Sequence, residues 1–187
     1  MDKSQTVFVA PREVRDLVYR ASRIAGCDPG TAEQIAQSVE FGEIHHGGAI
    51  GAFCGSLASG ELPVSPWVTA PDALLAAETA VRAAGSASVT FEPAVPLATI
   101  AATLWQGRMR GVANTGPDHR TRGDRAVSSV GLHRVDGEVS PPGRARIAEA
   151  DEAAHRLGIE VDRDVFSRLE ADAAGFLVAE SVLDQIE

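Results

Sequence analysis

The sequence contains little cysteine, almost no lysine and no long apolar run. Its two cysteines, Cys27 and Cys54, lie far apart and form no CxxC pair. A chain of 187 residues buries enough apolar surface to fold without a disulfide. We therefore expect both cysteines to be reduced and buried, and we predict neither a catalytic thiol nor a metal site.

No stretch approaches the roughly 20 apolar residues that a membrane-spanning helix requires. The first five residues lack the basic and then apolar pattern of a secretory leader. These features predict a cytoplasmic protein that contacts no membrane. The formal net charge of −9 would repel a phosphate backbone, which argues against nucleic-acid binding.

Lys3 is the only lysine, and the sixteen arginines are unevenly distributed. Residues 108–146 contain eight arginines and four acidic residues, so this segment is positive in a chain that is otherwise strongly negative. Such an asymmetry is typical of an anion site, a surface for a protein partner or a subunit contact. A solvated loop would show the same composition, and the pattern alone does not separate these interpretations.

Apolar spacing predicts helices at both ends of the chain. Near the N-terminus it favours a helix from Pro11 to about residue 25 and a second helix that begins at Asp28-Pro29. These two should pack as a hairpin, followed by a short third helix around residues 52–58. Near the C-terminus the pattern predicts a helix over residues 144–157 and another that Asp162 caps.

The middle of the chain mixes helix and strand signals. An extended piece is expected between Pro63 and Pro66, and a loop is expected over residues 114–124. The remaining patterns predict helices over residues 71–84 and 95–105 and strands over residues 88–91, 108–113 and 126–135.

These elements predict an α+β fold with helical hairpins at both ends around a small mixed sheet. We expect one domain over residues 1–187, made of an N-terminal helical part (1–62), a mixed α/β part (63–140) and a C-terminal helical part (141–187). Because the sheet is thin and Trp67 and Trp105 are expected at the surface, a homodimer is also predicted.

The first candidate site is the pair His45-His46, which precedes Gly47-Gly48 at the predicted end of a helix. This arrangement would leave an imidazole exposed beside bare backbone, where a substrate can approach closely. Adjacent helical residues point in different directions, so the two histidines cannot bind one metal ion as an i, i+4 pair does. The alternative is a histidine that offsets the helix dipole.

The second candidate site is the predicted loop that carries His119, Arg120, Arg122 and Arg125. Guanidinium groups beside a histidine could hold a carboxylate or a phosphate next to a proton donor. The alternative is a charged surface loop whose ions satisfy one another.

A third group, Asp151-Glu152 with His155 about one turn later, is interpreted as a solvated helix face. The chain contains no phosphate loop, no GxGxxG, no GxSxG and no cysteine quartet.

Several short motifs follow one another in a distinctive order. Residues 12–18 and 32–36 lie near the start, His45-His46-Gly47 and residues 57–62 follow, and the later ones are residues 111–119, 142–146 and 158–169. This order resembles the type 2 malate/L-lactate dehydrogenase family and a bacterial family of short proteins with the same helical ends. The resemblance implies a scaffold related to NAD(P)-dependent oxidoreductases, with His46 and His119 as acid and base and His45 among the substrate contacts.

Two departures favour a relative that is not a dehydrogenase. The chain is short in its centre, where that family largely holds cofactor and substrate, and Ile50 stands where the family has an arginine for the substrate carboxylate. An aliphatic side chain cannot replace a bidentate guanidinium. We therefore predict a protein that binds a small organic acid or a protein partner, with no assigned cofactor.

Two alternatives stay open at this point, so the sequence leaves undecided whether the protein is an enzyme. One is a minimal NAD(P)-dependent 2-hydroxy-acid oxidoreductase in which Arg120, Arg122 or Arg125 replaces the missing arginine. The other is an accessory subunit that docks on an acidic partner through residues 108–146.

Overall fold

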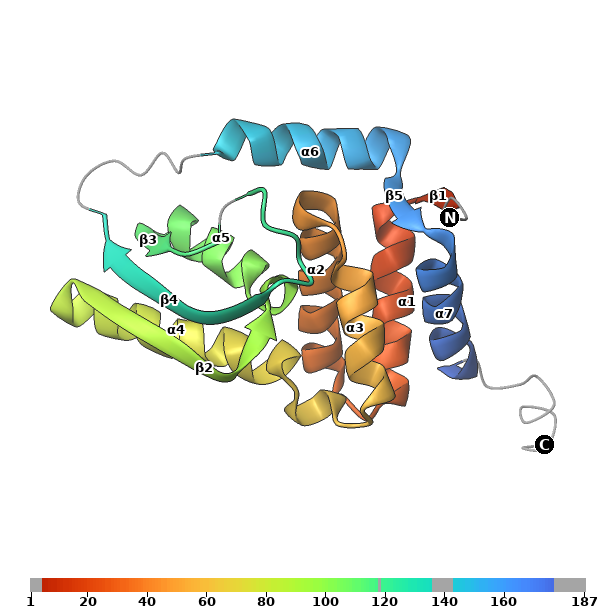
Figure 1. Cartoon of the computed structure of the whole chain (residues 1–187), viewed down its shortest axis with the longest axis horizontal. Coiled ribbons are helices and arrows are strands. Elements are labelled where there is room, and N and C mark those ends of the chain that lie inside the picture. Colours follow the sequence, from red (N-terminus) through yellow and green to blue (C-terminus); the bar gives the residue numbers. More distant parts are fainter. Residues whose placement is uncertain (1–4, 118, 136–142, 177–187) are drawn as a thin grey trace, which may run out of the picture.

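Four helices stand side by side in one half of the computed structural model, which describes residues 5–117, 119–135 and 143–176 (Figure 1). They are α1 (Pro11–Ile24), α2 (Pro29–His46), α3 (Ala49–Ala58) and α7 (Arg163–Ala173). Local sequence sets their ends: Asp28 accepts hydrogen bonds from the N–H groups of Gly30 and Thr31 at 2.9 and 3.1 Å, and so caps α2. The α1–α2 hairpin expected from the sequence is confirmed.

The other half is a three-stranded antiparallel sheet covered by two helices. The strand order is β2-β4-β3, and Val89 of β2 lies opposite Val130 of β4. Apolar side chains of the two helices and the three strands form a second core beside that of the helical half. The elements are α4 (Pro66–Ala84), β2 (Ser86–Pro96), α5 (Ala101–Met109), β3 (Val112–Thr115) and β4 (Ala126–Arg134).

The two halves meet along α2 and the short 3₁₀ helix η2 (Leu97–Thr99). Ala98 belongs to the core of the helical half, whereas Phe41 of α2 packs against the core of the sheet half. The N–H of Ala98 donates to the carbonyl oxygen of Gly123 at 2.9 Å, which ties the loop before β4 to this junction. Two further 3₁₀ turns are η1 (Leu62–Val64) and η3 (Ala174–Phe176).

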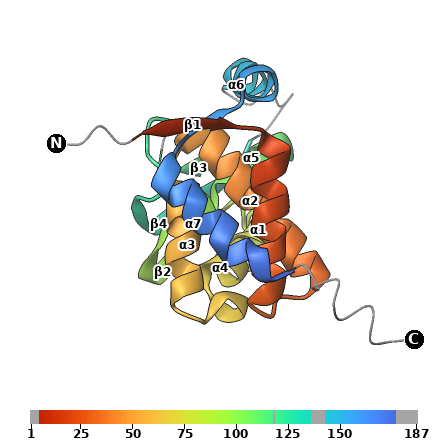
Figure 2. The same cartoon turned by 90° about the vertical axis from the view of Figure 1, so that its right-hand side faces the viewer.

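Helix α6 (Arg144–Leu157) lies across one end of the molecule, above the ends of α1 and α2 in Figure 1. It buries only Ile147 and Ala154, and it contacts α2. From its end the chain enters β5 (Ile159–Asp162), which pairs antiparallel with β1 (Thr6–Val9) in a separate two-stranded sheet (Figure 2).

The α+β class is confirmed, but the strands and the C-terminal helices differ from the prediction in detail. Both sheets are antiparallel rather than mixed, and the β1–β5 pair was not expected. The predicted C-terminal hairpin is wrong, because β5 separates the two helices and they contact different neighbours: α6 contacts α2, and α7 contacts α1 and α3.

The predicted surface position of Trp67 is also wrong. Its side chain is completely buried against Phe53, and its indole Nε1 donates to Ser56 Oγ at 3.0 Å. Helix α4 begins at Pro66, earlier than expected, because Ser65 caps it through the N–H of Trp67. Trp105 is half-buried.

The two cysteines are free and buried, as expected. Burial raises the pKa of the Cys54 thiol to about 11, so it stays protonated at neutral pH. Over the described ranges, no helix combines the length and the apolar character needed to cross a membrane.

Candidate functional site

A small cavity lies where the end of α2, helix α5, the first turn of α6 and the loop after β3 come together. Its volume is about 50 Å³, which is room for a few water molecules. His46 and His119, the two histidines predicted from the sequence as acid and base, both line this cavity. The other lining residues are Phe41, Leu97, Ala101, Leu104, Trp105, Arg108, Asn114, Pro117, Arg146 and Ile147.

The orientation of the His46 ring is fixed by the loop before β4. Its Nδ1 lies 2.9 Å from the carbonyl oxygen of Thr121. A carbonyl oxygen can only accept, so Nδ1 carries the hydrogen, and Nε2 is the basic nitrogen of the neutral ring. The half-buried ring is therefore held in one tautomer at the edge of the cavity.

The loop that holds His46 is itself fixed to the end of α2. The N–H of Gly123 donates to the carbonyl oxygen of Gly47 at 2.9 Å. Gly47 follows α2 with a φ of 68°, a conformation that L side chains rarely adopt. The glycines after the histidine pair and the glycine in the arginine-rich loop are thus parts of one local structure.

Two half-buried arginines face the cavity, Arg108 from α5 and Arg146 from α6. Arg108 Nη2 donates to Asn114 Oδ1, a neutral acceptor, at 2.8 Å. Within residues 5–117, 119–135 and 143–176, neither arginine forms an ion pair with a carboxylate, and no carboxylate lines the cavity. Burial and the like charge of Arg146 lower the pKa of Arg108.

The first turn of α6 adds to this positive character. Its N-cap residue is Gly143, which has no side chain to accept from the first N–H groups, and the turn contains no acidic residue. A helix N-terminus carries a partial positive charge. The turn also supplies Arg146 and Ile147 to the cavity lining, so the helix dipole and the two guanidiniums favour the same kind of ligand, an anion.

His45 has a different place from its neighbour. Its side chain is fully buried between α2 and α6, and the centroid of its ring lies 4.3 Å from the centroid of the Phe41 ring. Its Nε2 lies 3.0 Å from Asp151 Oδ1. The approach to Asp151 is not aligned as a hydrogen bond, so the pair is an electrostatic contact rather than a directed bond. Burial lowers the pKa of His45, and the charge of Asp151 opposes this shift.

The structure therefore places His45 behind the cavity rather than in its lining, where it holds α6 to α2. Glu152 and His155 are exposed, as expected for a solvated helix face. The Asp151 side chain on the same face is 45% exposed, and its carboxylate also faces His45.

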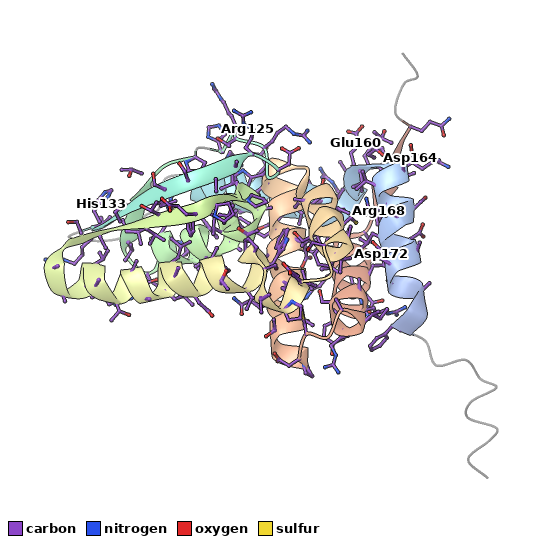
Figure 3. The ribbon with its side chains drawn as sticks, turned by 60° about the horizontal axis from the view of Figure 1, so that its bottom comes forward. Arg125, His133, Glu160, Asp164, Arg168 and Asp172 are labelled. Carbon is purple, nitrogen blue, oxygen red and sulfur yellow. The ribbon has the colours of Figure 1, made fainter. Side chains whose placement is uncertain are left out.

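None of the three arginines expected at the substrate lines the cavity that His46 lines. Arg120, Arg122 and Arg125 are exposed, and Figure 3 shows Arg125 at the surface of the loop before β4. Arg122 is paired with Asp124 through contacts of 3.1 and 3.3 Å, which raise the pKa of Arg122.

The Arg122–Asp124 pair borders a second cavity of about 410 Å³. This cavity is also lined by Glu43, Glu160 and Asp162, so carboxylates outnumber guanidiniums around it. Such a surface does not favour an acidic ligand.

Glu43 is a structural residue of this region that the sequence did not reveal. Its buried carboxylate accepts the N–H of Gly48 at 3.1 Å and the N–H of Ile50 at 2.8 Å. It thereby caps α3 from the preceding helix and fixes the turn after His46. A glutamate just before a Gly-Gly helix junction is the signal that could have indicated this cap. Ile50 is completely buried and belongs to the core.

Arg108 and Arg146 are two further lining residues that the sequence did not single out. Both lie in the positive segment 108–146, but no local motif connects two arginines at its opposite ends. Only the packing of α6 across the end of α2 brings them to one cavity.

No family model matches the chain, and comparison with curated proteins and with solved structures finds no match. The resemblance to malate/L-lactate dehydrogenases therefore stays a prediction. Across the described segments there is no cluster of three or more metal-binding side chains.

Proposed function

We propose that this protein binds a small organic acid in the cavity lined by His46, Arg108 and Arg146. The observation that carries the proposal is that two half-buried arginines from different helices reach one cavity with no carboxylate partner among the described residues. Removing a guanidinium from water without a counter-charge is unfavourable, and a bound acid would supply the missing charge.

The size of the cavity supports a binding protein over a dinucleotide-dependent enzyme. Sites that enclose drug-sized ligands have volumes of about 300–1,000 Å³. The cavity of about 50 Å³ suits the acid group of a small molecule and is small for a nicotinamide dinucleotide. Ile50, which stands where the family that the sequence resembles has its anchoring arginine, supports the same choice.

The alternative of a minimal oxidoreductase draws support from one observation. Thr121 holds the His46 ring in a single tautomer whose Nε2 is the basic nitrogen, which is the arrangement that acid–base chemistry requires. Under this alternative, NADH or NADPH binds and His46→Gln abolishes turnover of a 2-hydroxy acid.

Thermal unfolding with added ligand tests both. Pyruvate, oxaloacetate, phosphoenolpyruvate, NADH and NADPH are each titrated against the wild type, Arg108→Gln and Arg146→Gln. A ligand at about 100 times its Kd adds about 2.7 kcal/mol to the free energy of unfolding, which gives a clear rise in Tm. We expect an acid to raise the Tm of the wild type and not that of the two variants.

Arg156→Gln is the matched control, because Arg156 is exposed on the same helix as Arg146 and does not line the cavity. Equal shifts in wild type, control and both variants would contradict the proposed site. A shift with NADH or NADPH that His46→Gln removes, together with turnover, would replace binding with the oxidoreductase alternative.

A further inference from the structure

The residues that line the His46 cavity also indicate which acidic group of a ligand would bind there. We infer that the ligand group is compact and doubly charged, a phosphoryl group of a small phosphomonoester, and not a single carboxylate. This inference rests on the proposed function, because it assigns the chemistry of the ligand at that same site.

The first step is the charge of the lining. The described lining residues include two guanidiniums and no carboxylate, so the cavity holds two positive charges before any histidine is protonated. One carboxylate would neutralise one of these charges and leave the other half-buried without a counter-charge. A phosphomonoester carries a charge of about −1.5 to −2 at pH 7 and balances both.

The second step is the origin of the donors in the fold. Arg108 comes from α5, Arg146 from α6 and Asn114 from β3, so the donors reach the cavity from three elements. Asn114 Oδ1 accepts from Arg108, which leaves the amide N–H groups of Asn114 to donate. Donors from three separate elements suit the three terminal oxygens of a tetrahedral phosphoryl group, whereas a carboxylate offers two oxygens in one plane.

The third step combines the helix terminus and the volume. The first turn of α6 carries Arg146 and follows Gly143, an N-cap residue without a side chain, and a helix N-terminus of this kind can bind phosphate. A volume of about 50 Å³ accommodates one compact group and disfavours a dicarboxylate, whose two charges are separated by a carbon chain. The ligand's remaining atoms would leave through the opening of the cavity.

Isothermal titration calorimetry at pH 8 and constant ionic strength tests this choice with four probes: inorganic phosphate, sulfate, acetate and malonate. Phosphate and sulfate are compact dianions, acetate is a monoanion, and malonate is an extended dianion. We expect phosphate and sulfate to bind at least tenfold more tightly than acetate and malonate. Arg108→Gln and Arg146→Gln should each weaken phosphate at least tenfold and bring its affinity close to that of acetate.

Arg156→Gln serves again as the control and should bind phosphate as the wild type does. If Arg108→Gln does not fold, Arg108→Lys keeps the charge but removes the planar donor pair, and it should lose several-fold in phosphate affinity. The Tm of each variant without ligand verifies that it is folded.

Each other outcome overturns the inference in a recognisable way. If acetate or malonate binds best and the two cavity variants lose it, the site takes a carboxylic acid, and the proposed function stands without the phosphoryl assignment. If phosphate binds equally to the wild type, the control and both cavity variants, it binds elsewhere on the surface. If none of the four probes binds, the anion site itself is wrong, and the proposed function fails with it.

Discussion

The backbone N–H of Gly123 donates to the carbonyl oxygen of Gly47, and this bond joins two segments that lie far apart in the sequence. A Cβ atom at position 123 would lie 2.7 Å from that oxygen and 3.3 Å from Ala98 Cβ. The loop can therefore approach the end of α2 this closely only because residue 123 has no side chain. The same approach brings the carbonyl oxygen of Thr121 to His46 Nδ1.

Replacing this glycine should damage both stability and ligand binding. In Gly123→Ala the new methyl group collides with backbone, so the loop must move away from α2 and take Thr121 with it. We expect a loss of about 1–3 kcal/mol in the free energy of unfolding, as for other overpacked sites. Because the His46 ring loses its fixed orientation, affinity for the anionic ligand should fall as well. Urea unfolding and calorimetry measure the two effects.

The binding effect separates a positioning role from a purely structural one. His46→Gln removes the ring that Thr121 holds, so adding Gly123→Ala to His46→Gln should weaken ligand binding less than Gly123→Ala alone does. An equal loss in both backgrounds would mean that the loop acts on the ligand independently of His46.

Two glycines inside helices should respond to substitution by alanine in opposite directions. A Cβ on Gly55 of α3 meets no atom within 4 Å, and the residue is exposed. Gly55→Ala should therefore stabilise the protein by about 0.4–1 kcal/mol, because alanine reduces the conformational freedom of the unfolded chain. A Cβ on Gly42 of α2 would lie 3.0 Å from Ala49 Cβ and 3.1 Å from Ala98 Cβ, so Gly42→Ala should destabilise.

The shifts in urea midpoint of the two variants give the test. A loss of stability in Gly55→Ala would contradict the open space that the structure shows at this position of α3. An unchanged midpoint for Gly42→Ala would mean that α2, α3 and η2 are less tightly packed than the structure shows.

Sequence reasoning located the helices where local chemistry defines their ends. Asp28 and Asp162 were expected to cap helices, and each side chain accepts backbone N–H groups at the start of its helix. The α+β class followed from the same periodic patterns. Short-range signals of this kind are contained in a few neighbouring residues and need no knowledge of tertiary packing.

The remaining features depend on contacts between residues that are distant in the sequence. The β1–β5 pair joins the two ends of the chain, and nothing within four-residue strands indicates their partner. Arg108 and Arg146 share a cavity only because α6 crosses the end of α2. By contrast, the residues next to His46 and His119 in the sequence predict both histidines as site residues, and the fold brings both to the same cavity.

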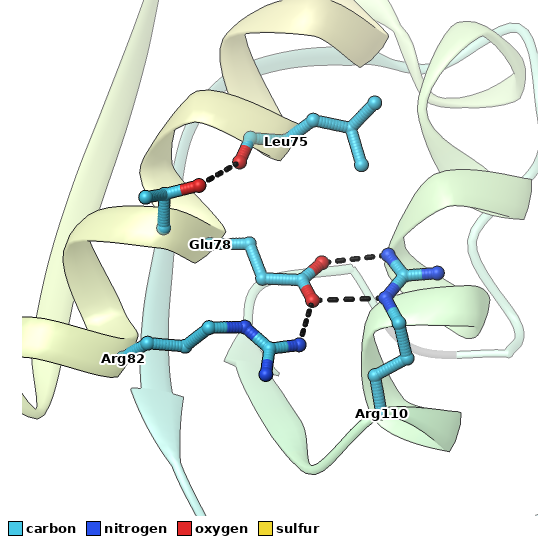
Figure 4. A network of polar contacts seen from close by, with 5 residues as sticks. Leu75, Glu78, Arg82 and Arg110 are labelled. Atoms are coloured by element: carbon cyan, nitrogen blue, oxygen red, sulfur yellow. Dashed lines mark hydrogen bonds and ion pairs between the residues drawn. The ribbon is translucent and has the colours of Figure 1, made fainter.

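The contact between Glu78 and Arg110 should make the free energy of unfolding decrease at acidic pH. Glu78 of α4 accepts two hydrogen bonds from Arg110 at 2.8 and 2.6 Å and one from Arg82 at 2.8 Å (Figure 4). Arg110 is the largest cause that lowers the pKa of Glu78, which falls to about 2. Because the folded pKa lies below the ordinary value of 4.5, this stabilisation is complete above pH 4.5 and disappears as the pH falls toward 2.

Glu78→Gln tests this network. At pH 7 the variant should lose about 1–3 kcal/mol, since a hydrogen-bonded charged group is replaced by a neutral one. Between pH 7 and pH 3 it should lose less stability than the wild type, because the group that titrates is gone. Glu170→Gln, at an exposed position of α7, should follow the wild-type curve. Parallel curves for the wild type and Glu78→Gln would rule out the network as a source of acid sensitivity.

The contact between the buried His45 and the partly exposed Asp151 should give a second pH dependence, at higher pH. Burial is the main cause that lowers the pKa of His45 below 6.5; Arg146 and His46 add to the shift, and Asp151 opposes it. As the pH falls through 6.5, His45 is therefore protonated in the unfolded chain before it is protonated in the folded protein. The free energy of unfolding decreases over this range, until the pH reaches the pKa of His45 in the folded protein. One such group changes the free energy of unfolding by at most about 1.4 kcal/mol per pH unit.

Two variants should change this slope in opposite directions between pH 7.5 and pH 5. His45→Gln removes the titrating ring, so its free energy of unfolding should depend less on pH than that of the wild type. Asp151→Asn removes the charge that favours protonated His45, so its stability should fall more steeply. His133→Gln, at the exposed position on β4 shown in Figure 3, should leave the slope unchanged. A wild-type slope in both His45→Gln and Asp151→Asn would show that this contact does not couple the docking of α6 to protonation.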